Sequence, residues 1–139
     1  MTARTRTAWR RTALALVLAL IGAGIFTGPA AAVPTSVAFT AQPPPEVVAA
    51  TPFPVQPMVH VMDGVNPVVG ATVTLSIRAS SGEGRGTLTC TGGQSRVTNA
   101  SGDATFAGCQ IDVAGSGYIL RATAGAVNAD TSPFAVLSG

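Results

Sequence analysis

The sequence contains no lysine and has only one histidine, His60. Charged residues make up 10% of the 139 positions, and no run of basic residues occurs after Arg11. Without a basic patch the chain has no electrostatic basis for binding nucleic acid or an anionic membrane surface. A single imidazole, with no Ser-His-Asp order around it, is not typical of a hydrolase, so we expect a protein that is not an enzyme and needs no cofactor.

Residues 1–32 have the pattern of a secretory signal peptide. Met1 to Arg11 carries four arginines and no acidic residue, Ala13 to Phe26 is a run of apolar residues and glycines, and Ala30-Ala31-Ala32 offers small residues for cleavage. The apolar run has fourteen residues, fewer than the roughly 20 that cross a bilayer. We therefore expect cleavage after Ala32, no membrane insertion of the mature chain, and one domain at residues 33–139 that is secreted or held at the cell envelope.

Removal of the leader reverses the net charge. The whole sequence carries a formal +2 with a pI near 8.9. Residues 33–139 keep four arginines against six carboxylates, which leaves a net charge of −2. A nucleic acid is therefore not expected as a partner, which leaves an unidentified protein or a component of the cell envelope as the expectation. The one tryptophan, Trp9, lies in the leader, which excludes a carbohydrate-binding face of stacked tryptophans in the mature domain.

Alternation of apolar and polar residues predicts an all-β domain. The expected strands are Thr35–Ala41, Val55–Met62, Val68–Arg78, Thr87–Cys90, segments around Ala104–Phe106 and Tyr118–Ala122, and Asp130–Leu137. Six of the ten prolines fall between Gln42 and Pro57, which predicts a stiff edge connection because proline cannot donate to a ladder. The small polar residues Thr98 to Asp103 predict a hairpin turn.

Cys90 and Cys109 are predicted to form a disulfide, because the two thiols of an exported chain meet an oxidising compartment. Counting outward from the predicted turn places position 92 opposite Cys109, and a bulge at Gly92 and Gly93 would bring Cys90 there instead. Closure of this loop should contribute on the order of 3 kcal/mol to stability.

Asp112, followed by small residues and Gly117-Tyr118, is typical of a tyrosine corner, in which the phenol bonds an upstream backbone group. With Val97–Gly108, Gly117–Thr123 and Thr131–Phe134, the chain resembles a bacterial immunoglobulin-like domain of the Big or invasin type. The resemblance implies an immunoglobulin-like Greek-key β-sandwich of seven to nine strands. It also implies a non-catalytic role in adhesion, protein interaction or structural spacing at a bacterial surface.

Antibody-type domains place their second cysteine two residues after the corner tyrosine, where this chain has Leu120. The predicted disulfide is therefore not the one that joins the two sheets of an antibody domain.

Met58, His60 and Met62 share one face of a predicted strand, each about 6.5–7 Å from the next. Thioether and imidazole groups bind soft metals, so these residues are candidate ligands of Cu(I). The alternative, which the sequence favours, is an ordinary outer sheet face that binds no metal.

Two other functions remain open. The first is a secreted carrier apoprotein for a small apolar molecule, although such apoproteins carry two disulfides and this chain can form one. The second is an inhibitor of an extracellular enzyme, with the loop Thr91–Ser95 as its exposed contact.

Overall fold

The computed structural model describes residues 32–82 and 85–139. Residues 1–31, which hold nearly all of the expected signal peptide, lie outside the described part, so the leader stays a prediction. The described chain is all-β and β-sandwich-like, as the alternation of apolar and polar residues predicted.

Thirteen strand segments occur among the described residues, more than the seven to nine expected. They are β1 (Ser36–Ala41), β2 (Glu46–Val48), β3 (Met58–Asp63), β4 (Asn66–Pro67), β5 (Thr72–Ile77), β6 (Leu88–Thr89), β7 (Ser95–Val97), β8 (Asp103–Thr105), β9 (Gln110–Ile111), β10 (Gly115–Tyr118), β11 (Leu120–Ala124), β12 (Val127–Asp130) and β13 (Phe134–Leu137). The number is higher mainly because short strands form that were not expected, among them β2, β4, β9 and β12. One expected strand is also divided, since Ile119 separates β10 from β11 where the chain passes from one sheet to another.

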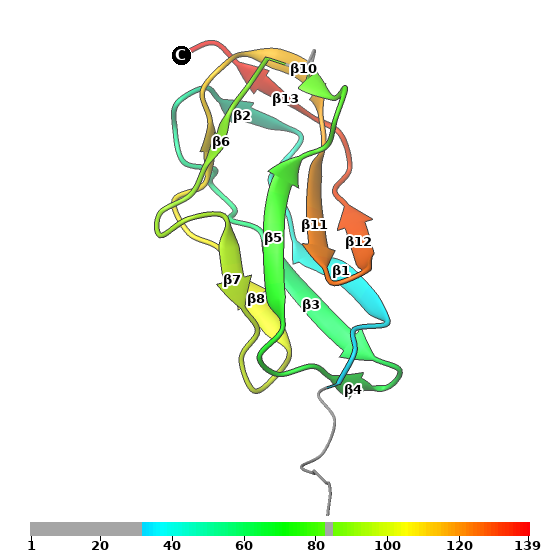
Figure 1. The fold of residues 1–139 in the computed structure, drawn as a ribbon. Helices are drawn as coiled ribbons and strands as arrows, with labels where there is room; N and C mark the ends of the chain where they lie inside the picture. Colours follow the sequence, from blue (N-terminus) through cyan, green and yellow to red (C-terminus); the bar gives the residue numbers. More distant parts are fainter. Residues whose placement is uncertain (1–31, 83–84) are drawn as a thin grey trace, which may run out of the picture. The chain divides into compact units, whose positions relative to one another are not determined.

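Two four-stranded sheets supply the largest share of the buried apolar side chains. The first sheet contains β3, which pairs with β1, β4 and β8. The second sheet has the order β12-β11-β5-β7. In Figure 1, β5 of the second sheet passes in front of β3 of the first. A smaller sheet, β10-β13-β2, and the β6–β9 pair complete the described part.

The core forms where the apolar faces of these sheets meet. It contains the fully buried Val59 and Val61 of β3, Val73 and Leu75 of β5, and Leu120 of β11. These are inward positions that the alternation predicted. Each fully buried side chain of this size stabilises the fold by about 1.5–3 kcal/mol relative to an exposed one.

The predicted hairpin at Thr98–Asp103 is wrong in its pairing. The turn itself forms, because the Asn99 side-chain carbonyl accepts the N–H groups of Ser101 at 2.8 Å and Asp103 at 3.1 Å. The strands on either side do not pair with each other, since β7 pairs with β5 and β8 pairs with β3. The turn therefore carries the chain from the second sheet to the first, and the register counted from it does not apply.

The proline-rich connection contains a short strand that the sequence did not predict. β2 pairs in parallel with β13 at the edge of the small sheet, with Val47 opposite Val136. This edge position agrees with the expectation that prolines exclude the segment from a sheet interior. Val47 is 3% exposed, so even this edge segment contributes to the core.

Candidate functional site: a groove beside β1

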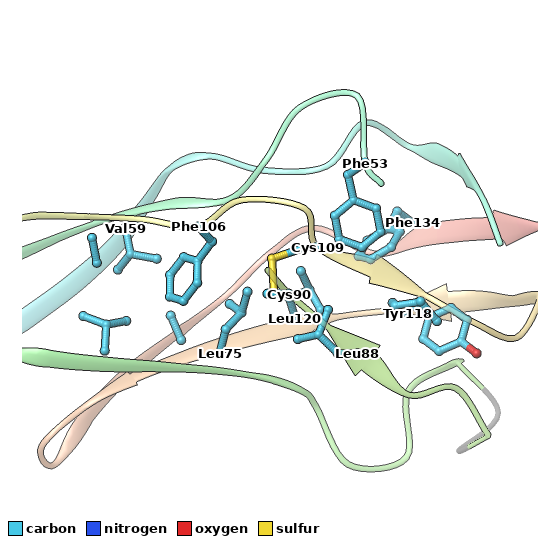
Figure 2. Close-up of a cluster of buried hydrophobic side chains, with 14 of the residues drawn as sticks. Phe53, Val59, Leu75, Leu88, Cys90, Phe106, Cys109, Tyr118, Leu120 and Phe134 are labelled. Atoms are coloured by element: carbon cyan, nitrogen blue, oxygen red, sulfur yellow. A yellow bond between two sulfur atoms is a disulfide. The ribbon is translucent and has the colours of Figure 1, made fainter. Parts of the chain in front are cut away.

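The disulfide predicted from the sequence joins Cys90 and Cys109. Cys90 follows β6 and Cys109 precedes β9, and these strands pair with Leu88 opposite Ile111. The bond thus connects neighbouring strands and does not bridge the two large sheets. Cys109 is fully buried and Cys90 is 6% exposed, and Figure 2 shows the sulfur atoms within the apolar core near Phe106. The role of this disulfide is structural.

Tyr118 donates a hydrogen bond from its hydroxyl to the Val113 carbonyl oxygen at 2.8 Å. The ring is fully buried and lies beside Phe134, with 6.2 Å between ring centroids. Asp112, named with Tyr118 in the expected corner, uses its carboxylate differently, accepting the N–H of Thr87 at 2.7 Å. Both side chains hold backbone segments in place.

The loop Thr91–Ser95 is held by a neighbouring side chain. The Arg96 guanidinium donates to the carbonyl oxygens of Thr91 and Gly92, and the Gly93 N–H donates to the Cys90 carbonyl at 3.0 Å. The loop residues are exposed. A braced, exposed loop next to a disulfide is compatible with a contact surface.

Met58, His60 and Met62 do share one face of β3, opposite the buried Val59 and Val61. His60 lies between two partners, with Nδ1 2.7 Å from Asp103 Oδ1 and Nε2 2.9 Å from Met62 Sδ. Across residues 32–82 and 85–139, no three His, Cys, Asp or Glu side chains gather closely enough to hold a metal ion. Any metal site on this face would therefore depend on thioether sulfur.

A groove of about 410 Å³ lies beside β1. Residues 37–42 of β1 and its end form one wall, and Ala129, Asp130 and Ser132 form the other. β1 and β12 are edge strands of different sheets that lie side by side without pairing in the described structure. One end is tied by the Gln42 side-chain carbonyl, which accepts the Ser132 N–H at 3.1 Å.

An edge strand presents backbone N–H and C=O groups along its unpaired side. β1 is paired through β3 alone among the described strands, so its other side borders the groove. Val37 and Phe39 are half-buried and pack against the core, whereas Ala38 and Thr40 are exposed. The groove therefore combines a hydrogen-bonding edge with small apolar surfaces.

A charged cluster lies at the β12 wall of this groove. Arg121 donates two hydrogen bonds to the Asp130 carboxylate, at 2.8 and 3.0 Å, and the Arg78 Nε lies 3.7 Å from the same carboxylate. The hydrogen bond from Arg121 lowers the pKa of Asp130 below its ordinary value. Two guanidinium groups thus face one carboxylate, which leaves a net positive charge next to Asp130, although neither Arg78 nor Arg121 lines the groove itself.

Reasoning from the sequence did not find this groove. The sequence predicted a last strand at Asp130–Leu137, of which only Phe134–Leu137 forms a strand, β13, and it did not predict β12 at Val127–Asp130. The signal was the turn before Val127, where Gly125 adopts a φ of 61° and lets β12 fold back on β11. The contact between β12 and β1 follows from the topology, because both are edge strands of their sheets.

No protein-family model, curated protein or solved structure matches this chain. The described residues include no helix that is both long and apolar enough to span a membrane.

Proposed function

We propose that the chain is a secreted or cell-surface-associated, non-catalytic immunoglobulin-like module that binds an extended peptide segment of a partner protein along β1. The observation that carries the proposal is the groove of about 410 Å³ beside an edge strand with no second strand partner in the described structure. Extended peptides bind to such edges by adding a strand, with backbone hydrogen bonds giving affinity and side-chain pockets giving specificity.

Two features support the immunoglobulin-like part of the proposal. β3 pairs with β1 and β8, while β5 pairs with β11 and β7, so consecutive stretches of chain alternate between sheets as in a Greek key. The Tyr118 hydroxyl bonds the Val113 carbonyl five residues upstream, at the entry to β11, which is the position of a tyrosine corner. Secretion follows from the leader expected at residues 1–32.

The charge beside the groove favours a peptide that carries an acidic side chain. Arg78 has 48% of its side chain exposed and is the more weakly engaged of the two arginines near Asp130. A carboxylate of the partner can therefore approach Arg78 without displacing the Arg121–Asp130 pair. The polar groups of Thr40, Gln42, Asp130 and Ser132 make the groove less suited to an apolar small molecule than to a peptide backbone.

A phage-displayed library of random linear peptides, selected on residues 33–139, tests this proposal. We expect the selected sequences to contain β-branched residues and at least one Asp or Glu. Calorimetry should then show about two- to fivefold weaker binding to the Arg78→Gln variant, the effect of losing one exposed ion pair.

Thr72→Glu is the matched control, because it changes the net charge equally at the exposed far end of β5. Its affinity for the peptide should equal that of the unaltered chain. Equal binding by the Arg78→Gln variant, or selected peptides that bind at the Thr91–Ser95 loop, would contradict the proposal. If the chain forms concentration-dependent dimers and these dimers prevent peptide selection, a second copy of the chain, and not a partner peptide, occupies the edge of β1.

A further inference from the structure

Neither neutral tautomer of His60 satisfies both contacts of its ring nitrogens. A neutral imidazole has one N–H donor and one bare nitrogen. If Nδ1 carries the proton, it donates to the Asp103 carboxylate at 2.7 Å, and the bare Nε2 faces the Met62 sulfur at 2.9 Å. Both atoms then present lone pairs to each other. If Nε2 carries the proton, the bare Nδ1 instead faces the carboxylate, which is worse because that oxygen bears a negative charge.

A positive charge on Nε2 resolves both contacts at once. A proton would make the ring an imidazolium that donates to Asp103 and to Met62. A soft metal cation would do the same by accepting electron pairs from Nε2 and from the thioether. The Asp103 carboxylate suits either case, since carboxylates behind a ligating histidine fix its tautomer and strengthen the nitrogen as a donor.

We propose that His60 Nε2 and Met62 Sδ form a binding site for a soft monovalent cation, Cu(I) or Ag(I), with Asp103 as the positioning residue. Imidazole and thioether are ligands that such cations accept, whereas Mg²⁺ and Ca²⁺ require oxygen. The site lies on the outer face of β3, where the side chains of His60 and Asp103 are 30% and 27% exposed. A cation therefore reaches it without opening the core.

The surroundings allow the small movement that binding requires. Metal–nitrogen and metal–sulfur bonds in proteins measure about 2.0–2.3 Å, so the two donor atoms must separate from 2.9 Å to between roughly 3 and 4 Å. Met62 has three rotatable side-chain bonds and can move its sulfur by this amount. Ala38 lies opposite His60 on β1 and presents only a methyl group on that side. The ring itself stays fixed by Asp103.

Titration with Ag(I), which is diamagnetic and does not change oxidation state, tests the site by NMR on residues 33–139. We expect the ¹⁵N signal of His60 Nε2 and the methyl signal of Met62 to shift together and saturate at one equivalent. Cu(I) kept reduced with ascorbate, which leaves disulfides intact, should give the same pattern. Absence of either shift would overturn the proposal.

Two matched variants make the assignment specific. Met62→Leu removes the sulfur at nearly constant volume and should weaken Ag(I) binding at least tenfold. Met58→Leu makes the same change on the same face of β3 and should leave affinity within about threefold. Equal losses in both variants would refute the two-ligand site.

Asp103→Asn should weaken binding about tenfold while the Met62 methyl shift persists, as expected of a residue that acts through the ring. An unchanged affinity would remove Asp103 from the site. The melting temperature of each variant, measured without metal, shows whether a loss of binding reflects a loss of fold.

Discussion

Reduction of the disulfide should lower stability by an amount that the structure allows us to estimate. Cys90 and Cys109 are nineteen residues apart, and closing a loop of that length removes conformational entropy from the unfolded chain worth on the order of 3 kcal/mol. For a domain near 100 residues, 1 kcal/mol shifts the melting temperature by about 4–8 °C. The expected fall is therefore about 12–24 °C.

The measurement is thermal unfolding followed by circular dichroism, with the protein either oxidised or reduced in denaturant and refolded under reductant. The double variant Cys90→Ala/Cys109→Ala is the control, because its melting temperature should be the same with and without reductant. It should melt at or below the reduced chain, since it also loses two buried sulfur atoms. A fall of less than about 4 °C on reduction would refute the estimate and the structural role of the bond.

Three further outcomes follow from the same structure. Tyr118→Phe should cost about 1–2 kcal/mol in the free energy of unfolding, measured by urea denaturation, because it leaves the Val113 carbonyl without its hydroxyl donor; a neutral result would show that water replaces the bond. Gly82→Ala should destabilise far more than Gly117→Ala, since both have positive φ but only the first would press a methyl group into the Tyr118 ring; equal melting temperatures would contradict this packing. The pKa of Asp130 is lower in the folded chain than its ordinary value of 3.8, so its contribution is complete above that pH and is lost as the pH falls through the folded pKa. The stability difference between the unaltered chain and Asp130→Asn should therefore be constant near neutral pH and shrink below about pH 4, and a difference that persists in acid would contradict the ion pair.

The alternation of side chains predicted the layers of the fold because burial on one face imposes a period of two. Val59, Val61, Val73 and Leu75 are buried as expected for that reason. The pairing of the strands could not be predicted from this alternation. A polar turn such as Thr98–Asp103 has the same composition whether it closes a hairpin or passes between sheets, and only the faces of distant strands decide between these outcomes.

The disulfide was predicted correctly, although the strand register used to place its cysteines opposite each other was wrong. The prediction rested on the expectation that two thiols pair in an oxidising compartment, whatever the register of the strands. The register itself arises from the β6–β9 pair, whose two-residue strands are too short to be recognised by alternation. The groove beside β1 escaped prediction for a related reason, since it depends on two edge strands far apart in the sequence.

Hydrogen exchange by NMR at the backbone amides of residues 37–42 tests the proposed binding mode most directly. With a selected acidic peptide at saturation, we predict that alternate amides along β1 exchange at least tenfold more slowly, because the peptide supplies acceptors to the unpaired side of the strand. Unchanged exchange along β1, with protection at another surface, would contradict the claim that this chain works by accepting a strand.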